Sequence, residues 1–141
     1  MKHIDIALGE VGVKEILGNQ DNPRIIEYFN ELGFDGSKLH DETSWCAAFA
    51  NWVLKKAGLE YQNTLNARSF LDIGWMTETP KLGDVVIYWR ESPDSWKGHV
   101  GFYINEKYGY IWTLGGNQGN QVQISAYPKN KVLGYRRMTN E

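Results

Sequence analysis

Residues 44–58, which read SWCAAFANWVLKKAG, decide how this chain folds. Their apolar side chains recur with the spacing of one helix face, at Cys46, Phe49, Ala50, Val53, Leu54 and Ala57. Ser44 is the expected N-cap and Gly58 the expected stop. The stretch therefore predicts a helix over 45–57 that is buried along one side and carries Cys46 in its first turn.

The pattern on either side of this helix changes from helical to extended. A weak apolar period predicts a short helix near 4–13, the Asn22-Pro23 pair begins another over 23–32, and a third short helix is expected over 67–73. After residue 83 the period falls to two, which predicts five short strands at 85–89, 99–104, 110–114, 122–124 and 133–137. Helices followed by consecutive strands indicate an α+β fold, with N-terminal helices packed on a roughly five-stranded antiparallel sheet.

Length and charge limit what the protein can do. The 141 residues predict one domain spanning 1–141, which we expect to be a monomer. A net charge of -2 argues against nucleic-acid binding, and a single cysteine excludes an internal disulfide framework. The first residues lack the apolar run of a signal peptide, and no 18-residue apolar stretch appears. We therefore expect a protein made in the cytoplasm, with no membrane insertion.

The position of Cys46 suggests a nucleophile. The first peptide N–H groups of a helix lack intrahelical partners, and their dipole stabilises a thiolate or an oxyanion. The alternative is that Cys46 is a small apolar residue on the core face, since cysteine is among the most buried residue types. Position alone leaves both interpretations open.

A nucleophilic cysteine needs a base, and the chain has three histidines. His3 lies near a terminus and His40 in a polar stretch, so we expect both to be exposed. His99 begins a strand and points to the face opposite Val100, with Gly101 beside it on that face. This glycine leaves room next to the imidazole for another chain or a substrate, which makes His99 the candidate base.

A third group should orient the imidazole. A hairpin turn near Tyr108 places Asn117 opposite His99, within a residue or two, and the Asn117 amide oxygen can accept an imidazole N–H. The surrounding run 115–120, GGNQGN, is alternatively a simple turn, while a phosphate loop is disfavoured because the run lacks a Lys-Ser/Thr ending.

No metal site is predicted from the sequence. Asp41 and Glu42 adjoin His40 without a regular ligand spacing, so we expect solvated charges. Whether these two acidic residues bind calcium stays open.

Three motifs together resemble one family. Residues 44–49 (SWCAAF), 98–101 (GHVG) and 116–117 (GN) are similar to the cysteine- and histidine-dependent amidohydrolase/peptidase (CHAP) family, which is related to the NlpC-type cell-wall peptidases. The resemblance implies a reduced papain-like fold and a peptidoglycan hydrolase without a cofactor. Such an enzyme cuts as an N-acetylmuramoyl-L-alanine amidase or as a peptide endopeptidase. A phage endolysin or a delivered toxin both fit, each acting on the wall after release or delivery.

The resemblance also assigns roles to residues. Cys46 becomes the nucleophile, whose own peptide N–H holds the oxyanion, His99 the base and then the acid, and Asn117 the orienting group. Many family members carry an acidic residue two positions before the asparagine, where this chain has Gly115. Two tryptophans that flank these motifs, Trp45 and Trp96, are candidate walls of a substrate groove, with packing over the core edge as the alternative. A cysteine acyltransferase or deamidase acting on protein, or an inactive wall-binding module, are the other functions left open.

Overall fold

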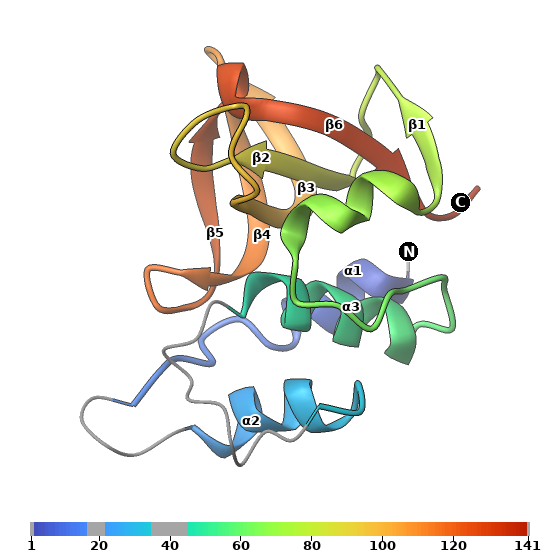
Figure 1. Cartoon of the computed structure of the whole chain (residues 1–141), viewed down its shortest axis with the longest axis vertical. Helices are drawn as coiled ribbons and strands as arrows, with labels where there is room; N and C mark the ends of the chain where they lie inside the picture. The colour runs from blue at the N-terminus through green and yellow to red at the C-terminus, as the bar shows by residue number, and fades with distance from the viewer. Residues whose placement is uncertain (1, 17–21, 35–44, 141) are drawn as a thin grey trace.

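A computed structural model describes residues 2–16, 22–34 and 45–140 (Figure 1). Its helical elements are α1 (Lys2–Leu8), α2 (Pro23–Asn30), α3 (Cys46–Lys56) and the 3-10 helices η2 (Ala67–Asp72) and η3 (Lys129–Lys131). Its strands are β1 (Trp75–Thr77), β2 (Val85–Trp89), β3 (Gly98–Lys107), β4 (Tyr110–Gln118), β5 (Gln121–Pro128) and β6 (Val132–Arg137). They form a six-stranded antiparallel sheet in the order β1-β6-β2-β3-β4-β5. The predicted α+β fold is confirmed.

The elements differ from the prediction mainly at their ends. Helix α3 begins at Cys46, one residue later than expected, and the expected N-cap Ser44 lies outside the described residues. Strands β3, β4 and β5 run several residues further than their apolar alternation indicated. The sixth strand, β1, was not predicted, because this three-residue edge strand pairs only with β6 and buries none of its residues fully.

Helix α3 lies at the centre of the molecule. Figure 1 shows α1 and α3 beneath the sheet, with α2 on the far side of α3. Nine consecutive residues of α3 are buried, because the helix packs against the sheet on one side and α2 on the other. Trp45, just before the helix, is also fully buried. A smaller apolar cluster occupies the opposite face of the sheet, formed by Val86, Tyr88, Tyr103 and Ile111.

His3 is not the exposed residue that the sequence predicted. Its side chain is only 1% exposed, and its Nε2 donates to the Gly83 carbonyl oxygen at 2.7 Å. The ring also contacts Phe102, with 5.6 Å between ring centroids. His3 lies in the first turn of α1, so its hydrogen bond to Gly83 and its contact with Phe102 connect the first helix to the sheet.

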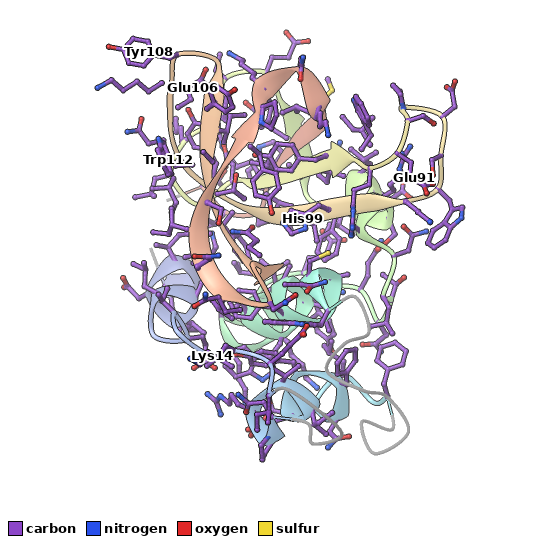
Figure 2. All side chains as sticks on the ribbon, turned by 90° about the vertical axis from the view of Figure 1, so that its left-hand side faces the viewer. Lys14, Glu91, His99, Glu106, Tyr108 and Trp112 are labelled. Carbon is purple, nitrogen blue, oxygen red and sulfur yellow. The ribbon has the colours of Figure 1, made fainter. Side chains whose placement is uncertain are left out.

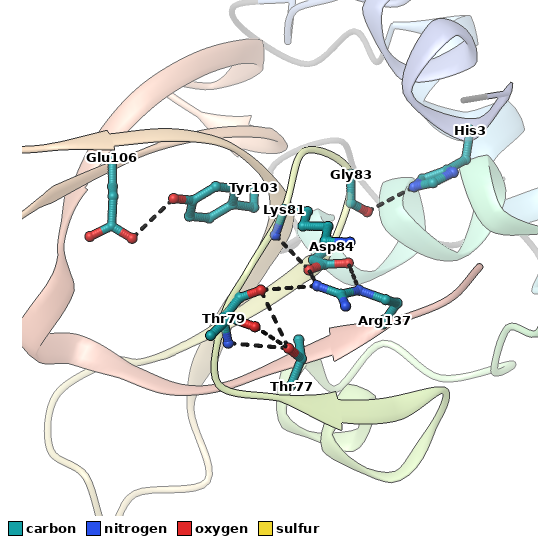
Figure 3. A network of polar contacts seen from close by, with 9 residues as sticks. All are labelled: His3, Thr77, Thr79, Lys81, Gly83, Asp84, Tyr103, Glu106 and Arg137. Atoms are coloured by element: carbon teal, nitrogen blue, oxygen red, sulfur yellow. Dashed lines mark hydrogen bonds and ion pairs between the residues drawn. The ribbon is translucent and has the colours of Figure 1, made fainter. Parts of the chain in front are cut away.

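An ion pair connects the residue before β2 to the last residue of β6 (Figure 3). Arg137 donates to both carboxylate oxygens of Asp84, from Nε at 3.0 Å and from a terminal nitrogen at 2.7 Å. Asp84 is 4% exposed and also accepts the Lys81 peptide N–H at 2.7 Å. This bidentate geometry and the extra donor satisfy a carboxylate that is almost entirely removed from water.

We expect Asp84→Ala to lower the free energy of unfolding by about 3 kcal/mol, because removing one partner leaves the other charge uncompensated. Thermal melts followed by circular dichroism should show a loss of about 10 °C in Tm. Lys129→Ala is the matched control, because it breaks an exposed ion pair with Glu106 of 2.8 Å and should change Tm little. Equal losses in the two variants would contradict this account of Asp84.

Candidate active site

The fold brings Cys46 and His99 together. Cys46 opens α3 and is 2% exposed, while His99 is the second residue of β3 and is 5% exposed. Figure 2 shows His99 where the sheet meets the helical layer. The Cys46 side chain acts on the His99 ring both as a charge and as a hydrogen-bond partner. The N-terminus of a buried helix therefore delivers the thiol to the imidazole.

The second ring nitrogen of His99 bonds to Gln118. His99 Nε2 lies 2.9 Å from Gln118 Oε1. The orientation of the Gln118 amide follows from its other bonds, because its Nε2 donates to the carbonyl oxygens of Thr113 at 2.9 Å and Gln123 at 2.8 Å. Gln118 Oε1 is thus the acceptor and His99 Nε2 the donor. This tautomer leaves His99 Nδ1 for Cys46.

The orienting amide belongs to Gln118 rather than to Asn117, one residue away from the sequence prediction. A bulge in β4 explains the difference, because Gly115 pairs with Gln123 and Gln118 with Gln121, so β4 holds one extra residue. Asn117 takes up this residue with a left-handed φ of 57°. The side-chain alternation shifts accordingly, which turns Gln118 toward His99. Asn117 instead lines the adjacent cleft.

Gly115 makes room for the Gln118 amide, and Gly101 makes room for the Thr113 side chain. A Cβ on Gly115 would collide with Gln118 Oε1, and one on Gly101 would lie 3.5 Å from that atom and 2.5 Å from a Thr113 methyl group. Gly115 is the position at which the sequence departs from the usual CHAP pattern. The Gln118 side chain, 1% exposed, fills the space that a side chain at 115 would take. The absence of a side chain at 115 and the placement of the Gln118 amide are therefore sterically linked.

Two tyrosine rings stack in series on one face of the His99 imidazole. Tyr127 stacks on His99 with 4.9 Å between centroids and 20° between planes, and Tyr88 stacks on Tyr127 at 4.9 Å. The Tyr88 hydroxyl is fixed by a 2.6 Å bond to Thr113 Oγ1. Burial raises the pKa of Tyr127 to about 12, with a further contribution from the Cys46 charge, so its phenol stays neutral at physiological pH.

The charge on His99 reflects opposing effects. Burial lowers its pKa, but the Cys46 thiolate and the hydrogen bonds to Cys46 and Gln118 raise it more, and the net pKa lies above the ordinary value. Arg90 has a smaller lowering effect. A raised pKa means that the imidazolium persists to higher pH than in an unpaired histidine. The arrangement therefore favours a thiolate–imidazolium pair.

We expect Cys46→Ala to lower the pKa of His99 relative to the wild type, because the thiolate is removed while burial still opposes the charge. NMR titration of the His99 ring protons measures this shift. Cys46→Ser is the companion variant, since it keeps a hydrogen-bonding group without the negative charge, and it should also lower the pKa. An unchanged titration in both variants would show that the two side chains are not coupled.

Two pockets flank the Cys–His pair. The larger, of about 670 Å³, is bordered by His99, Asn117 and Tyr127, and the smaller, of about 220 Å³, by Cys46 and Trp96. Arg90 borders both, so the two pockets are neighbours, and together they are called the groove below. Trp96 is 71% exposed at the rim of the smaller pocket. The thiol thus borders one pocket and the imidazole the other.

Trp45 does not line the groove, contrary to the expectation. It is 0% exposed, and its indole Nε1 donates to Glu15 Oε1 at 2.9 Å. The indole packs under Gly116, where a Cβ would lie 2.7 Å from its ring. Glu15, for which the sequence suggested a place near the cleft or a surface or cap role, borders the larger pocket. The hydrogen bond from Trp45 thus holds the Glu15 carboxylate beside the larger pocket.

The remaining sequence expectations concern metals and membranes. The described residues contain no group of three or more His, Cys, Asp or Glu side chains that would hold a metal ion. His40, Asp41 and Glu42 lie outside the described residues. Within the described part of the chain, every helix is too short or too polar to cross a bilayer.

Comparison with known families agrees with this geometry. The profile of the CHAP domain matches residues 38–117, a segment that covers more than half of the chain and contains both Cys46 and His99. The chain belongs to the CHAP domain family. CHAP domains are found in cysteine peptidases and amidases that act on the bacterial cell wall, so this protein is a member of a hydrolase family.

A solved structure supports the fold of this CHAP domain. A protein described as similar to a lipoprotein of the NLP/P60 family, from Staphylococcus aureus subsp. aureus Mu50, superposes with a TM-score of 0.52 at 19% identity. The match covers 99% of this chain and 41% of that protein, so the CHAP domain spans less than half of its neighbour. Among curated proteins no significant sequence match is found. The papain-like relation to the NlpC type is confirmed at the level of fold.

Proposed function

We propose that this protein hydrolyses an amide bond of peptidoglycan by a Cys46–His99 mechanism, as an N-acetylmuramoyl-L-alanine amidase or a peptide endopeptidase. The observation that supports this most strongly is the buried line of side chains from Cys46 through His99 to Gln118. The three side chains match the nucleophile, the base and the orienting group that such a reaction needs. The groove on both sides of the thiol is open to a thin, extended substrate.

The reaction begins when His99 Nδ1 takes the proton of the Cys46 thiol. The thiolate attacks the carbonyl carbon of the scissile amide, and the developing oxyanion lies at the positive end of α3. The imidazolium then protonates the leaving amine, the C–N bond breaks, and a thioester to Cys46 remains. His99 next takes a proton from water, whose oxygen attacks the thioester and releases the carboxylic acid and the thiol.

Gln118 and Tyr127 fix the tautomer and the orientation of the His99 ring. The Gln118 amide oxygen holds the tautomer in which Nδ1 faces the thiol. It also accepts a hydrogen bond from the Nε2–H group of the imidazolium. Tyr127 covers one ring face and restricts rotation of the imidazole. Neither residue exchanges a proton in the reaction as proposed, so both are positioning residues.

We also propose that the chain works as one monomeric catalytic unit with a bacteriolytic role, as an endolysin or a delivered wall hydrolase. Purified peptidoglycan incubated with the protein should release soluble fragments, whose masses and new end groups identify the bond that is cut. A new free muramoyl carboxylate indicates the amidase, and a new peptide amine with the muramoyl–alanine amide still intact indicates the endopeptidase. Intact walls alongside ammonia release from protein glutamine would replace this proposal with a deamidase.

A further inference from the structure

The larger pocket of the groove is positively charged although the chain as a whole is not. The formal net charge of the protein is -2. Among the described residues, the charged side chains that border the pocket, apart from His99, are Arg90, Lys131 and Glu15. The Glu15 carboxylate already accepts the Trp45 indole N–H. Two cations and one carboxylate therefore border the cleft, and the indole N–H orients that carboxylate without cancelling its charge.

Neither cation is neutralised by the described part of the protein. Among the described residues no carboxylate pairs with Arg90 or Lys131, whereas other basic side chains such as Arg24 and Arg137 do form ion pairs. Lys131 instead places its Nζ over the Trp89 ring, 4.9 Å from the centroid. The indole of Trp89 borders the same pocket and holds the Lys131 ammonium against its face.

Arg90 is held in place by its backbone. It directly follows β2, and its peptide N–H donates to the Lys97 carbonyl oxygen at 3.2 Å. The Arg68 guanidinium also anchors this loop. It donates hydrogen bonds to the carbonyl oxygens of Lys97 at 2.7 Å, Pro93 at 2.8 Å and Ser92 at 2.9 Å. The loop that carries Arg90 is thus anchored, while its guanidinium stays exposed to the cleft.

We infer that Arg90 and Lys131 form a subsite for a free carboxylate on the peptide substrate, placed close to the scissile amide. The cleft of about 670 Å³ holds a segment of a few residues. A guanidinium binds a carboxylate in a bidentate manner, and Asn117 and Asn120, which also border the pocket, can add neutral amide donors. The substrate class is therefore an acidic peptide with an unblocked carboxylate, as a γ-linked glutamate presents through its α-carboxylate.

This subsite is coupled to the chemistry. The Arg90 charge lowers the pKa values of both His99 and Tyr127, so it acts on the imidazole from within the groove. A carboxylate bound to Arg90 offsets that charge, and the imidazolium of His99 then becomes easier to form. Substrates with the carboxylate should consequently favour the thiolate–imidazolium pair more than substrates in which it is amidated.

The inference rests on the proposed function for its substrate, but binding tests it without turnover. The probes are L-Ala-γ-D-Glu-L-Lys and its isoglutamine counterpart, which differ only in a carboxylate and a carboxamide. Titration calorimetry with Cys46→Ala at low salt should give at least about tenfold tighter binding of the acid. Salt should reduce this ratio, because exposed charges are screened.

Variants of the cations complete the experiment. Arg90→Gln with Lys131→Gln, in the Cys46→Ala background, should bind both probes equally, while Arg90→Lys should restore part of the preference. Lys107→Gln is the matched control, since Lys107 lies at the tip of the β3–β4 hairpin with its Nζ over the Tyr108 ring. Figure 2 shows Tyr108 well away from His99. Equal affinities for acid and amide before the cations are changed, or a preference that survives the double change, would overturn the subsite.

Turnover separates this inference from the proposed function. If wild-type protein releases no fragments from peptidoglycan but Cys46→Ala still prefers the acid, the wall-hydrolase proposal fails and the carboxylate subsite stands. If fragments are released and the two probes bind equally, the hydrolase stands and the subsite fails.

Discussion

Cys46→Ala should abolish the release of fragments from purified peptidoglycan, with kcat/KM reduced by at least about 10⁴-fold. The reason is that the proposed covalent step has no substitute, because Cys46 is the only cysteine of the chain. His99→Ala should lose a comparable factor, since the thiol then lacks its base, and the double variant should lose little more than either single variant. Zymography and a soluble-fragment assay measure all three.

In these variants, a loss of activity caused by unfolding must be distinguished from a loss of the catalytic group. Cys46 and His99 are both buried, so thermal melts should accompany each assay. Alkylation with iodoacetamide near pH 6 gives an independent readout, because His99→Ala should slow it if the imidazolium supports the thiolate. Clearing of the wall by folded Cys46→Ala at the wild-type rate would refute the nucleophile assignment.

Gln118→Ala should reduce kcat by about 10²-fold, because loss of the 2.9 Å bond lets the imidazole leave its productive orientation. The bell-shaped pH profile should also shift, since Gln118 contributes to the raised pKa of His99. A purely structural role would leave the pH profile in place. Gln118→Glu should retain more activity than Gln118→Ala, because a carboxylate oxygen also accepts the Nε2 proton.

Asn117→Gly is the matched control for Gln118→Ala. Glycine tolerates the left-handed backbone of this position, so the bulge should persist. This change should affect KM more than kcat, because Asn117 lines the cleft rather than contacting the imidazole. A loss of kcat at Asn117 with Gln118→Ala near wild type would return the orienting role to the residue that the sequence favoured.

The link between Gly115 and Gln118 allows a test by exchange. Gly115→Asp alone should inactivate the protein, because the new Cβ collides with the Gln118 amide. Combined with Gln118→Gly, the aspartate enters the vacated space and should recover part of the activity lost by removing Gln118. No recovery in the double variant would show that the two positions are not interchangeable.

Local sequence signals predicted much of the architecture. The apolar face of residues 46–57 and the period-two stretch at 85–89 correspond to α3 and β2 within one residue, since both elements are buried along their length. Strand β1 was missed, because an exposed edge strand of three residues has no apolar alternation to detect. His3 was misjudged for a related reason: proximity to a terminus says nothing about which side of α1 packs inward.

The sequence by itself determined the chemistry that is available: one cysteine at a helix start, one histidine at a strand start and a glycine-rich run after the next strand. Each of these signals is local, set by caps, periodicity and turn residues. Only the tertiary structure decided which amide holds His99, because one extra residue in β4 exchanges the faces of Asn117 and Gln118. It also decided that Trp45 is buried and that Arg90 and Lys131 share a cleft, since those outcomes depend on how distant segments pack.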